Sequence, residues 1–302
     1  MPPKAQKKKK QQTVLTDLVG GSHKTGNQSS NANDAAEQSA TTHTLSFDGK
    51  HIEYERYGST KSEHKLVFTH GAGGGIANPA TKLFAKGAAT KALVYSFQGS
   101  MNLPSRTKSF SAMIDHHKDD EATTTVLGGR SMGARAAVLA AADHAEIKHL
   151  VLASYPLVGQ NGSVRDDILL AIDEGVKVLF ISGDSDNMCS IKQLNEVRKK
   201  MKAKSWLAIV QGADHGMSIK PKSAVEDMRL YTGKLAARWI EDNDNDKTEC
   251  ELRWNAHEKT VVNDGWKSVA AKGMSDSKSA TKFVEADADD VQQRPAKRQR
   301  KR

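Results

Sequence analysis

Cysteine, aromatic residues and long apolar runs are all scarce in this 302-residue sequence. Only Cys189 and Cys250 are present, too few for a disulfide framework, and their spacing matches no zinc site, so we expect a reducing compartment. No run of eighteen apolar residues occurs, and the basic, polar start MPPKAQKKKKQQ has no apolar stretch after it. No internal repeat of fixed period is visible, which disfavours a solenoid or a propeller. We therefore predict neither a secreted chain nor a membrane-spanning one.

Positive charge is unevenly distributed along the chain. The sequence has 45 Lys and Arg against 36 Asp and Glu, a formal charge of +9. Residues 1–40 hold six lysines against three acidic residues, and residues 243–302 hold thirteen basic against eleven acidic residues. The middle of the chain is therefore only mildly basic, and the basicity that stands out is clustered near the two ends.

Polar composition also separates the two ends from the middle. From Gly20 to Thr42 large apolar side chains are almost absent, so this stretch cannot bury enough surface to offset the entropy of ordering it. We predict a disordered basic tail over 1–41, a folded domain over 42–242 and a polar tail over 243–302. Apolar residues of the last segment could still form a small element that docks on the domain, namely Leu252, Trp254, Val261, Val262 and Trp266.

Six short apolar runs without polar alternation dominate the middle of the sequence. Such runs are typical of strands buried on both faces, and they cover residues 66–70, 92–96, 124–129, 149–154, 176–182 and 205–210. Helical segments fill the intervals, notably 132–142, 191–201 and 225–240. This alternation predicts an α/β fold with a mostly parallel, doubly wound sheet. A hairpin over residues 44–58, with its bend at Asp48-Gly49, is expected to precede it.

The pentapeptide Gly-Arg-Ser-Met-Gly at residues 129–133 fits the G-x-S-x-G motif. It follows a predicted strand and precedes an Ala-rich predicted helix, which is the context that a nucleophile elbow requires. Gly129 and Gly133 are expected because side chains there would collide with the adjoining strand and helix. We predict that Ser131 is the nucleophile; the alternative is a chance pentapeptide in a glycine-rich loop.

A serine nucleophile needs a histidine to remove its proton and an acid to orient that histidine. In this fold the order along the chain is Ser, acid, His, and His215 in QGADHGM is the good candidate beyond the acid-bearing strand. The acid should follow the strand VLFIS, where Asp184 and Asp186 compete. We prefer Asp186 for its reach to the histidine, because Asp184 could instead stabilise the turn. Asp214, adjacent to the histidine, is expected to be solvated.

Acyl transfer also needs donors for the oxyanion. One is expected from the backbone N–H of Met132, directly after the nucleophile, and the other from that of Ala72 in the loop HGAGGG. A glycine-rich loop after a first strand could instead hold a dinucleotide. The loop lacks the G-x-G-x-x-G spacing, however, and no ribose-binding acid is convincing, so we expect no cofactor and no metal.

Five motifs occur in one order along the chain: FTHGAGGG, LGGRSMGARAA, SYPL, FISGDSDNMC and GADHGM. In that order they resemble the α/β-hydrolase-like family of the testis-expressed and non-specific-lethal-complex subunit three proteins, whose broader relatives are similar to dienelactone hydrolases. The resemblance covers roughly residues 44–240 and implies an α/β-hydrolase fold with Ser131, Asp186 and His215 in the triad positions. The segment Gly75-Ile76-Ala77-Asn78 departs from the family, whose members commonly carry an acidic residue there.

The segment between Ser154 and Val176 is where larger hydrolases insert caps of several helices. Its roughly twenty residues are too few for one, so we expect a shallow, open site suited to a small or exposed acyl group. Arg106 and Arg130 lie near strand ends and could attract an anionic substrate. The interpretation that we favour for both is a solvated surface arginine.

Basic segments near the two ends predict residence in the nucleus. The last nine residues, RPAKRQRKR, hold six positive charges, and Lys7–Lys10 adds four. The residues expected to contact a nuclear import receptor are Lys297, Arg298, Arg300, Lys301 and Arg302. A solvated charged terminus is the alternative, and either run could contact nucleic-acid phosphates without sequence preference.

Gln12, Leu15 and Leu18 resemble a sliding-clamp-binding box, in which Gln is followed by an aliphatic residue and then by two aromatic ones. Leu18 and Val19 stand where the rings would be, so most of the anchoring in a clamp pocket is lost. We favour a short amphipathic turn in a tail.

The sequence as a whole predicts a lidless α/β hydrolase, an esterase-like enzyme with a Ser-Asp-His triad and without a cofactor. The alternative is a non-catalytic nuclear interaction module, such as a chromatin-complex subunit, on a hydrolase scaffold.

Overall fold

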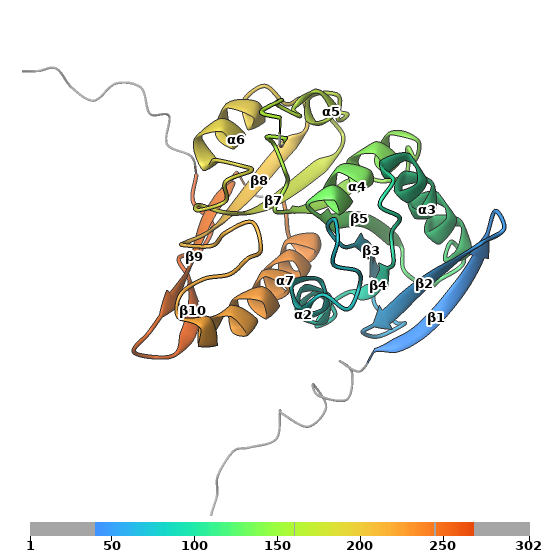
Figure 1. Ribbon diagram of the computed structural model, residues 1–302, viewed down its shortest axis with the longest axis horizontal. Coiled ribbons are helices and arrows are strands. Elements are labelled where there is room, and N and C mark those ends of the chain that lie inside the picture. The colour runs from blue at the N-terminus through green and yellow to red at the C-terminus, as the bar shows by residue number, and fades with distance from the viewer. Residues whose placement is uncertain (1–39, 160, 245, 269–302) are drawn as a thin grey trace, which may run out of the picture.

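The computed structural model describes residues 40–159, 161–244 and 246–268 as one sheet covered by helices on both faces (Figure 1). The strand order is β1-β2-β4-β3-β5-β6-β7-β8-β9-β10. The strands are β1 (Thr41–Phe47), β2 (Lys50–Tyr57), β3 (His64–Thr69), β4 (Leu93–Phe97), β5 (Thr124–Arg130), β6 (His149–Ala153), β7 (Lys177–Gly183), β8 (Lys204–Val210), β9 (Glu249–Asn255) and β10 (Thr260–Asn263). From β4 through β9 neighbouring strands are parallel, and the antiparallel pairs are β1–β2, β2–β4 and β9–β10.

The six predicted apolar runs form β3 to β8, each within two residues of its expected bounds. Their side chains are buried on both faces because helices cover both faces. The helices are α2 (Pro79–Ala88), α3 (Leu103–His116), α4 (Met132–Ala142), α5 (Asp167–Leu170), α6 (Ile191–Arg198), the 3₁₀ turn η1 (Lys222–Ala224) and α7 (Val225–Glu241). The predicted doubly wound α/β sheet and the hairpin turning at Asp48-Gly49 are confirmed.

Two apolar cores lie on opposite faces of the sheet. One lies between the sheet and α3, α4 and α6, and includes Phe110, Ala137 and Leu194. The other lies under α2 and α7, which pack against each other, and includes Phe84 and Trp239. Because the strands from β4 to β9 run parallel, their carboxyl ends lie together at one edge of the sheet, and this edge carries the loops that hold the predicted site residues.

The predicted end of the domain at residue 242 is wrong. β9 and β10 follow it, and β9 pairs in parallel with β8, so that the β1–β2 and β9–β10 hairpins lie at opposite ends of the sheet (Figure 1). The strand alternates, with Cys250 and Leu252 buried against the α7 core. Trp254 and Trp266 pack on the same core, so the element that the sequence left open does dock.

The other expectations on chain organisation have mixed outcomes. Between β6 and β7 the described residues form the four-residue α5 and no multi-helix cap, as predicted. In the described part of the chain no helix is long and apolar enough to span a membrane. The predictions for the import signal and the clamp-binding box lie outside the described residues.

Candidate active site

Ser131 lies in a sharp turn between β5 and α4 at the edge of the sheet where the parallel strands end. Its backbone has a φ of 54° and a ψ of −114°, a conformation that residues other than glycine rarely adopt. A Cβ on Gly129 would lie 2.2 Å from the carbonyl carbon of Gly133, and one on Gly133 would lie 2.5 Å from the carbonyl oxygen of Thr69. Both glycines are therefore required by close backbone approach, as expected for a nucleophile elbow.

The structure brings Ser131, His215 and Asp186 together in one hydrogen-bond chain. Ser131 Oγ lies 2.9 Å from His215 Nε2, and His215 Nδ1 lies 2.8 Å from Asp186 Oδ2. The carboxylate side chain of Asp186 is completely buried, and its other oxygen accepts the Met188 N–H at 2.8 Å. With Nδ1 donating to the carboxylate, Nε2 is the acceptor that faces the serine hydroxyl. This geometry can remove the hydroxyl proton during nucleophilic attack.

The competing acids have other partners. Asp184 Oδ1 accepts the Gly212 N–H at 2.7 Å, so this carboxylate ties two turns together. Asp214 Oδ1 accepts the Ser218 N–H at 2.9 Å. Neither is hydrogen-bonded to the imidazole, and Asp186 occupies the place that the sequence reasoning preferred.

The two predicted oxyanion donors belong to segments close to Ser131. Met132 is the first residue of α4, where a backbone N–H has no acceptor within the helix. The loop that carries Ala72 passes close to the nucleophile, because a Cβ on its neighbour Gly71 would lie 3.3 Å from Ser131 Cβ. Ala72 itself is exposed. The role of the two amides as oxyanion donors stays a prediction.

Two buried side chains hold the Ala72 loop, and the sequence analysis missed both roles. His70 Nε2 accepts the Gly99 N–H at 3.0 Å, and its Nδ1 donates to the Gly71 carbonyl oxygen at 2.6 Å. Arg106 is fully buried and donates to the carbonyl oxygens of His70, Gly99 and Ser100. Burial lowers the pKa of His70, so the imidazole is neutral, and lowers the pKa of Arg106 to about 10.

The interpretation of Arg106 and Arg130 as solvated surface arginines is wrong. Arg106 is held by carbonyl groups inside the protein, and the Arg130 guanidinium donates to the carbonyl oxygen of His215. Burial lowers the pKa of both. A sequence signal existed for Arg130, since it ends a strand buried on both faces, but no pattern shows that distant carbonyl groups will surround a guanidinium.

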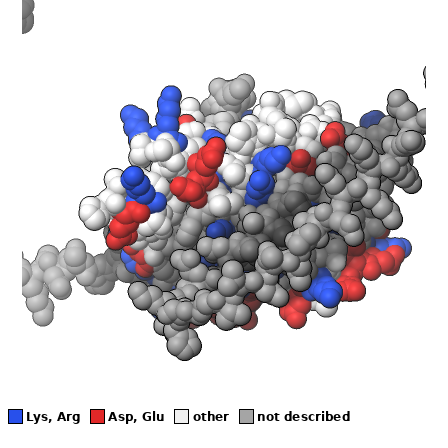
Figure 2. Space-filling view, turned by 90° about the horizontal axis from the view of Figure 1, so that it is seen from below, with Lys and Arg blue, Asp and Glu red and all other residues white. Residues whose placement is uncertain are grey.

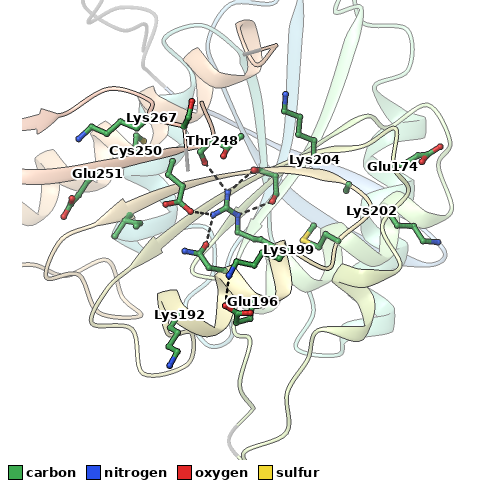
Figure 3. A pocket seen from close by; sticks show the side chains of 18 residues that line it. Glu174, Lys192, Glu196, Lys199, Lys202, Lys204, Thr248, Cys250, Glu251 and Lys267 are labelled. Atoms are coloured by element: carbon green, nitrogen blue, oxygen red, sulfur yellow. Dashed lines mark hydrogen bonds and ion pairs between the residues drawn. The ribbon is translucent and has the colours of Figure 1, made fainter. Parts of the chain in front are cut away.

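A cleft of about 1010 Å³ lies elsewhere, between α6 and the first residues of β8 and β9 (Figure 3). These are the amino ends of parallel strands, whereas Ser131 is at the carboxyl ends. Arg198 binds Glu249 at 2.6 Å in this cleft. The labelled lysines point away from one another instead of converging. This cleft is therefore separate from Ser131, Asp186 and His215, and its lysines do not converge on a position where one anion could bind.

Charge on the described surface is mixed. On the face shown in Figure 2, Lys and Arg lie among Asp and Glu over the atoms that are described. This agrees with the mild basicity of the middle of the sequence.

Comparisons with known proteins place the fold. A family model described as an alpha/beta hydrolase domain matches residues 62–241, more than half of the chain. The chain belongs to this alpha/beta hydrolase family. The matched residues leave out the two hairpins, β1–β2 and β9–β10, at the ends of the sheet.

Solved structures similar to this chain share its fold at low sequence identity. Est1E from Butyrivibrio proteoclasticus has a TM-score of 0.54 at 16% identity, covering 67% of this chain and 99% of that one. Dienelactone hydrolase from Anabaena variabilis has a TM-score of 0.55 at 14% identity, with 67% and 97% covered. A serine hydrolase without a lid from Xanthomonas campestris has a TM-score of 0.52 at 17% identity, with 66% and 94% covered.

Proposed function

We propose that the chain is a serine hydrolase that cleaves an ester or thioester of a small or exposed acyl group. The observation that carries this proposal is the continuous hydrogen-bond chain from Ser131 through His215 to the buried Asp186 carboxylate. A serine hydroxyl is a weak nucleophile, and this arrangement supplies a base with its orienting acid. It favours an enzyme over the non-catalytic nuclear module.

In the proposed reaction, His215 Nε2 accepts the hydroxyl proton of Ser131 while Oγ attacks the acyl carbon. The amides of Ala72 and Met132 stabilise the negative charge that develops on the carbonyl oxygen. The imidazolium, oriented by Asp186, then gives its proton to the leaving alcohol or thiol. Water, activated by the same imidazole, attacks the acyl-serine and releases the carboxylic acid and free Ser131.

The openness of the site supports small or exposed acyl groups. Only the short α5 lies between β6 and β7 in the described residues, so a long acyl chain would find no cap to cover it. The similar structures include one described as an esterase domain, from Rhodothermus marinus. An ester substrate is consistent with that description, although a shared fold does not by itself fix chemistry.

Hydrolysis of p-nitrophenyl acetate tests the proposal. We expect turnover by the wild type and loss of about 10³-fold or more in kcat for Ser131→Ala and for His215→Ala. Circular dichroism and thermal unfolding must show that both variants fold. Equal turnover by the wild type and folded Ser131→Ala would contradict the proposal.

We also propose, from the residues that carry the family resemblance, that the chain is related to the testis-expressed and non-specific-lethal-complex proteins. From the basic segments near its two ends we propose that it works in the nucleus. Residues 288–302 fused to a fluorescent reporter should carry it into the nucleus, and a cytoplasmic reporter would contradict the signal. Chromatin-complex partners would co-purify with the full chain. A peptide of residues 5–25 that fails to bind a sliding clamp would remove the contact through Gln12, Leu15 and Leu18.

A further inference from the structure

The Arg130 side chain lies between the two loops that serve the nucleophile. One terminal nitrogen of its guanidinium, Nη2, donates to the carbonyl oxygen of His215. A Cβ on Gly71 would lie 3.7 Å from the other, Nη1, so this nitrogen lies against the loop that carries Ala72. The residue that precedes the nucleophile thus contacts the base loop and the oxyanion loop at once.

A second arginine holds the same base loop from α7. Arg229 Nη2 donates to the carbonyl oxygen of Gly216 at 2.8 Å and lies 3.3 Å from Ser218 Oγ. Two consecutive carbonyl groups, those of His215 and Gly216, therefore each accept from a guanidinium. Arg130 and Arg229 also line one small interior cavity of about 10 Å³, among apolar side chains.

Charged groups on four elements lie at the loop that carries His215. The Asp186 carboxylate follows β7, Arg130 ends β5, Asp214 shares the His215 loop, and Arg229 belongs to α7. Burial and Arg229 lower the pKa of Arg130, whereas the two carboxylates raise it. Of these groups, Arg130 also lies against the loop that carries Ala72.

We propose that Arg130 is a positioning residue that fixes the His215 loop against the nucleophile and the Ala72 loop. This inference rests on the proposed hydrolase function for its kinetic readout. The role needs the planar guanidinium, since one nitrogen donates to the His215 carbonyl oxygen while the other lies against Gly71. Lys keeps the charge and loses this planar fork, so it separates the effect of position from that of charge.

The test compares Arg130→Gln and Arg130→Lys in the hydrolysis of p-nitrophenyl acetate. For Arg130→Gln we expect kcat to fall about 10- to 100-fold with KM changed less than about threefold, because the base is misplaced and substrate binding is not. Arg130→Lys keeps the positive charge without the fork, so we expect its kcat to fall by a similar factor.

Arg198→Gln is the matched control. Arg198 is also buried and also donates to backbone carbonyl groups, those of Ser205 and Thr248, but it lies in the cleft at the opposite ends of the strands. A general loss of stability would affect both Gln variants alike. A kcat that stays at the wild-type value in folded Arg130→Gln or Arg130→Lys, or one that falls equally in folded Arg198→Gln, would overturn the proposal.

A second readout does not depend on activity. Hydrogen exchange of the backbone amides of residues 214–218 should be faster in Arg130→Gln than in the wild type and unchanged in Arg198→Gln. A wild type that hydrolyses nothing would contradict the hydrolase function alone, because the exchange rates still test Arg130. Equal exchange rates in the wild type and in Arg130→Gln would overturn the role of Arg130 whether or not the enzyme turns over.

Discussion

Two carboxylates that lie two positions apart in the sequence have different roles. Asp184 and Asp186 follow the same strand, yet the first accepts a backbone N–H from Gly212 and the second accepts from the His215 imidazole. The side chain of Asp186 is buried, and the low local dielectric constant strengthens the interaction of its carboxylate with the two hydrogen-bond donors. The two carboxylates differ in role because their side chains leave the same turn in different directions.

The Asn variants of these two residues should therefore differ. Asp186→Asn is expected to lower kcat by about 10⁴-fold, because an amide favours the wrong imidazole tautomer. Asp184→Asn keeps an oxygen for the Gly212 N–H and should change kcat by less than about threefold. Steady-state kinetics on both proteins checks this, and similar losses in the two would show that the assignment of the acid is wrong.

A buried histidine at the other end of the sheet gives a stability prediction. His117 stacks on Tyr95, with ring centroids 3.6 Å apart, and burial lowers its pKa to about 4. The unfolded chain binds the proton near pH 6.5 and the folded chain does not, so stability is fully present above that pH and falls as the pH drops toward 4. Between pH 7 and 5 the loss from His117 is about 2 kcal/mol.

His117→Phe keeps an aromatic ring against Tyr95 and removes the titration. Urea unfolding at pH 7 and at pH 5 should therefore show a smaller loss of unfolding free energy on acidification for this variant, by about 2 kcal/mol. An unchanged loss would mean that other groups account for the acid sensitivity.

At the scale of elements, β9 and β10 show why the end of the domain could not be read from composition. The segment ECELRWN alternates polar and apolar residues among many charged neighbours, so it resembles a tail. In the structure its buried positions, Cys250 and Leu252, complete the core under α7. Arg198 on α6 also binds Glu249, which fixes the strand from the other face.

Truncation tests whether the folded domain ends at residue 242 or after β10. A chain that ends at residue 268 should keep the unfolding temperature of the full protein. One that ends at residue 242 should lose several kcal/mol of stability or aggregate, because β8 becomes an open edge and Leu252 leaves the core. Thermal unfolding of both chains decides this, and equal stability would show that β9 and β10 add little.

At the scale of the whole molecule, the sequence predicted the sheet, the elbow and the three hydrogen-bonded side chains. Apolar runs are local, and Ser131, Asp186 and His215 each follow a strand, so their meeting at one edge follows from the parallel topology. The roles of Arg106 and Arg130 could not be predicted, because they depend on carbonyl groups from loops far along the chain. The extension of the sheet by β9 and β10 could not be predicted either, because that segment has the composition of a charged tail.

The short connection between β6 and β7 also predicts a substrate range. Among p-nitrophenyl esters, acetate and butyrate should give a higher kcat/KM than laurate, since the described residues place only α5 there to enclose a long chain. Activity should also rise smoothly through the critical micelle concentration, because a site without a cap has nothing to open. A preference for laurate, or a jump in rate at that concentration, would point to an enclosed acyl pocket.

Covalent labelling shows whether Ser131 is an activated nucleophile. A fluorophosphonate probe should add one adduct to the folded wild-type protein, located on Ser131 by mass spectrometry. Folded Ser131→Ala should take up no label, and His215→Ala should label far more slowly because its base is gone. A well-folded wild type that remains unlabelled, or a label that persists in Ser131→Ala, would show that Ser131 is not an activated nucleophile.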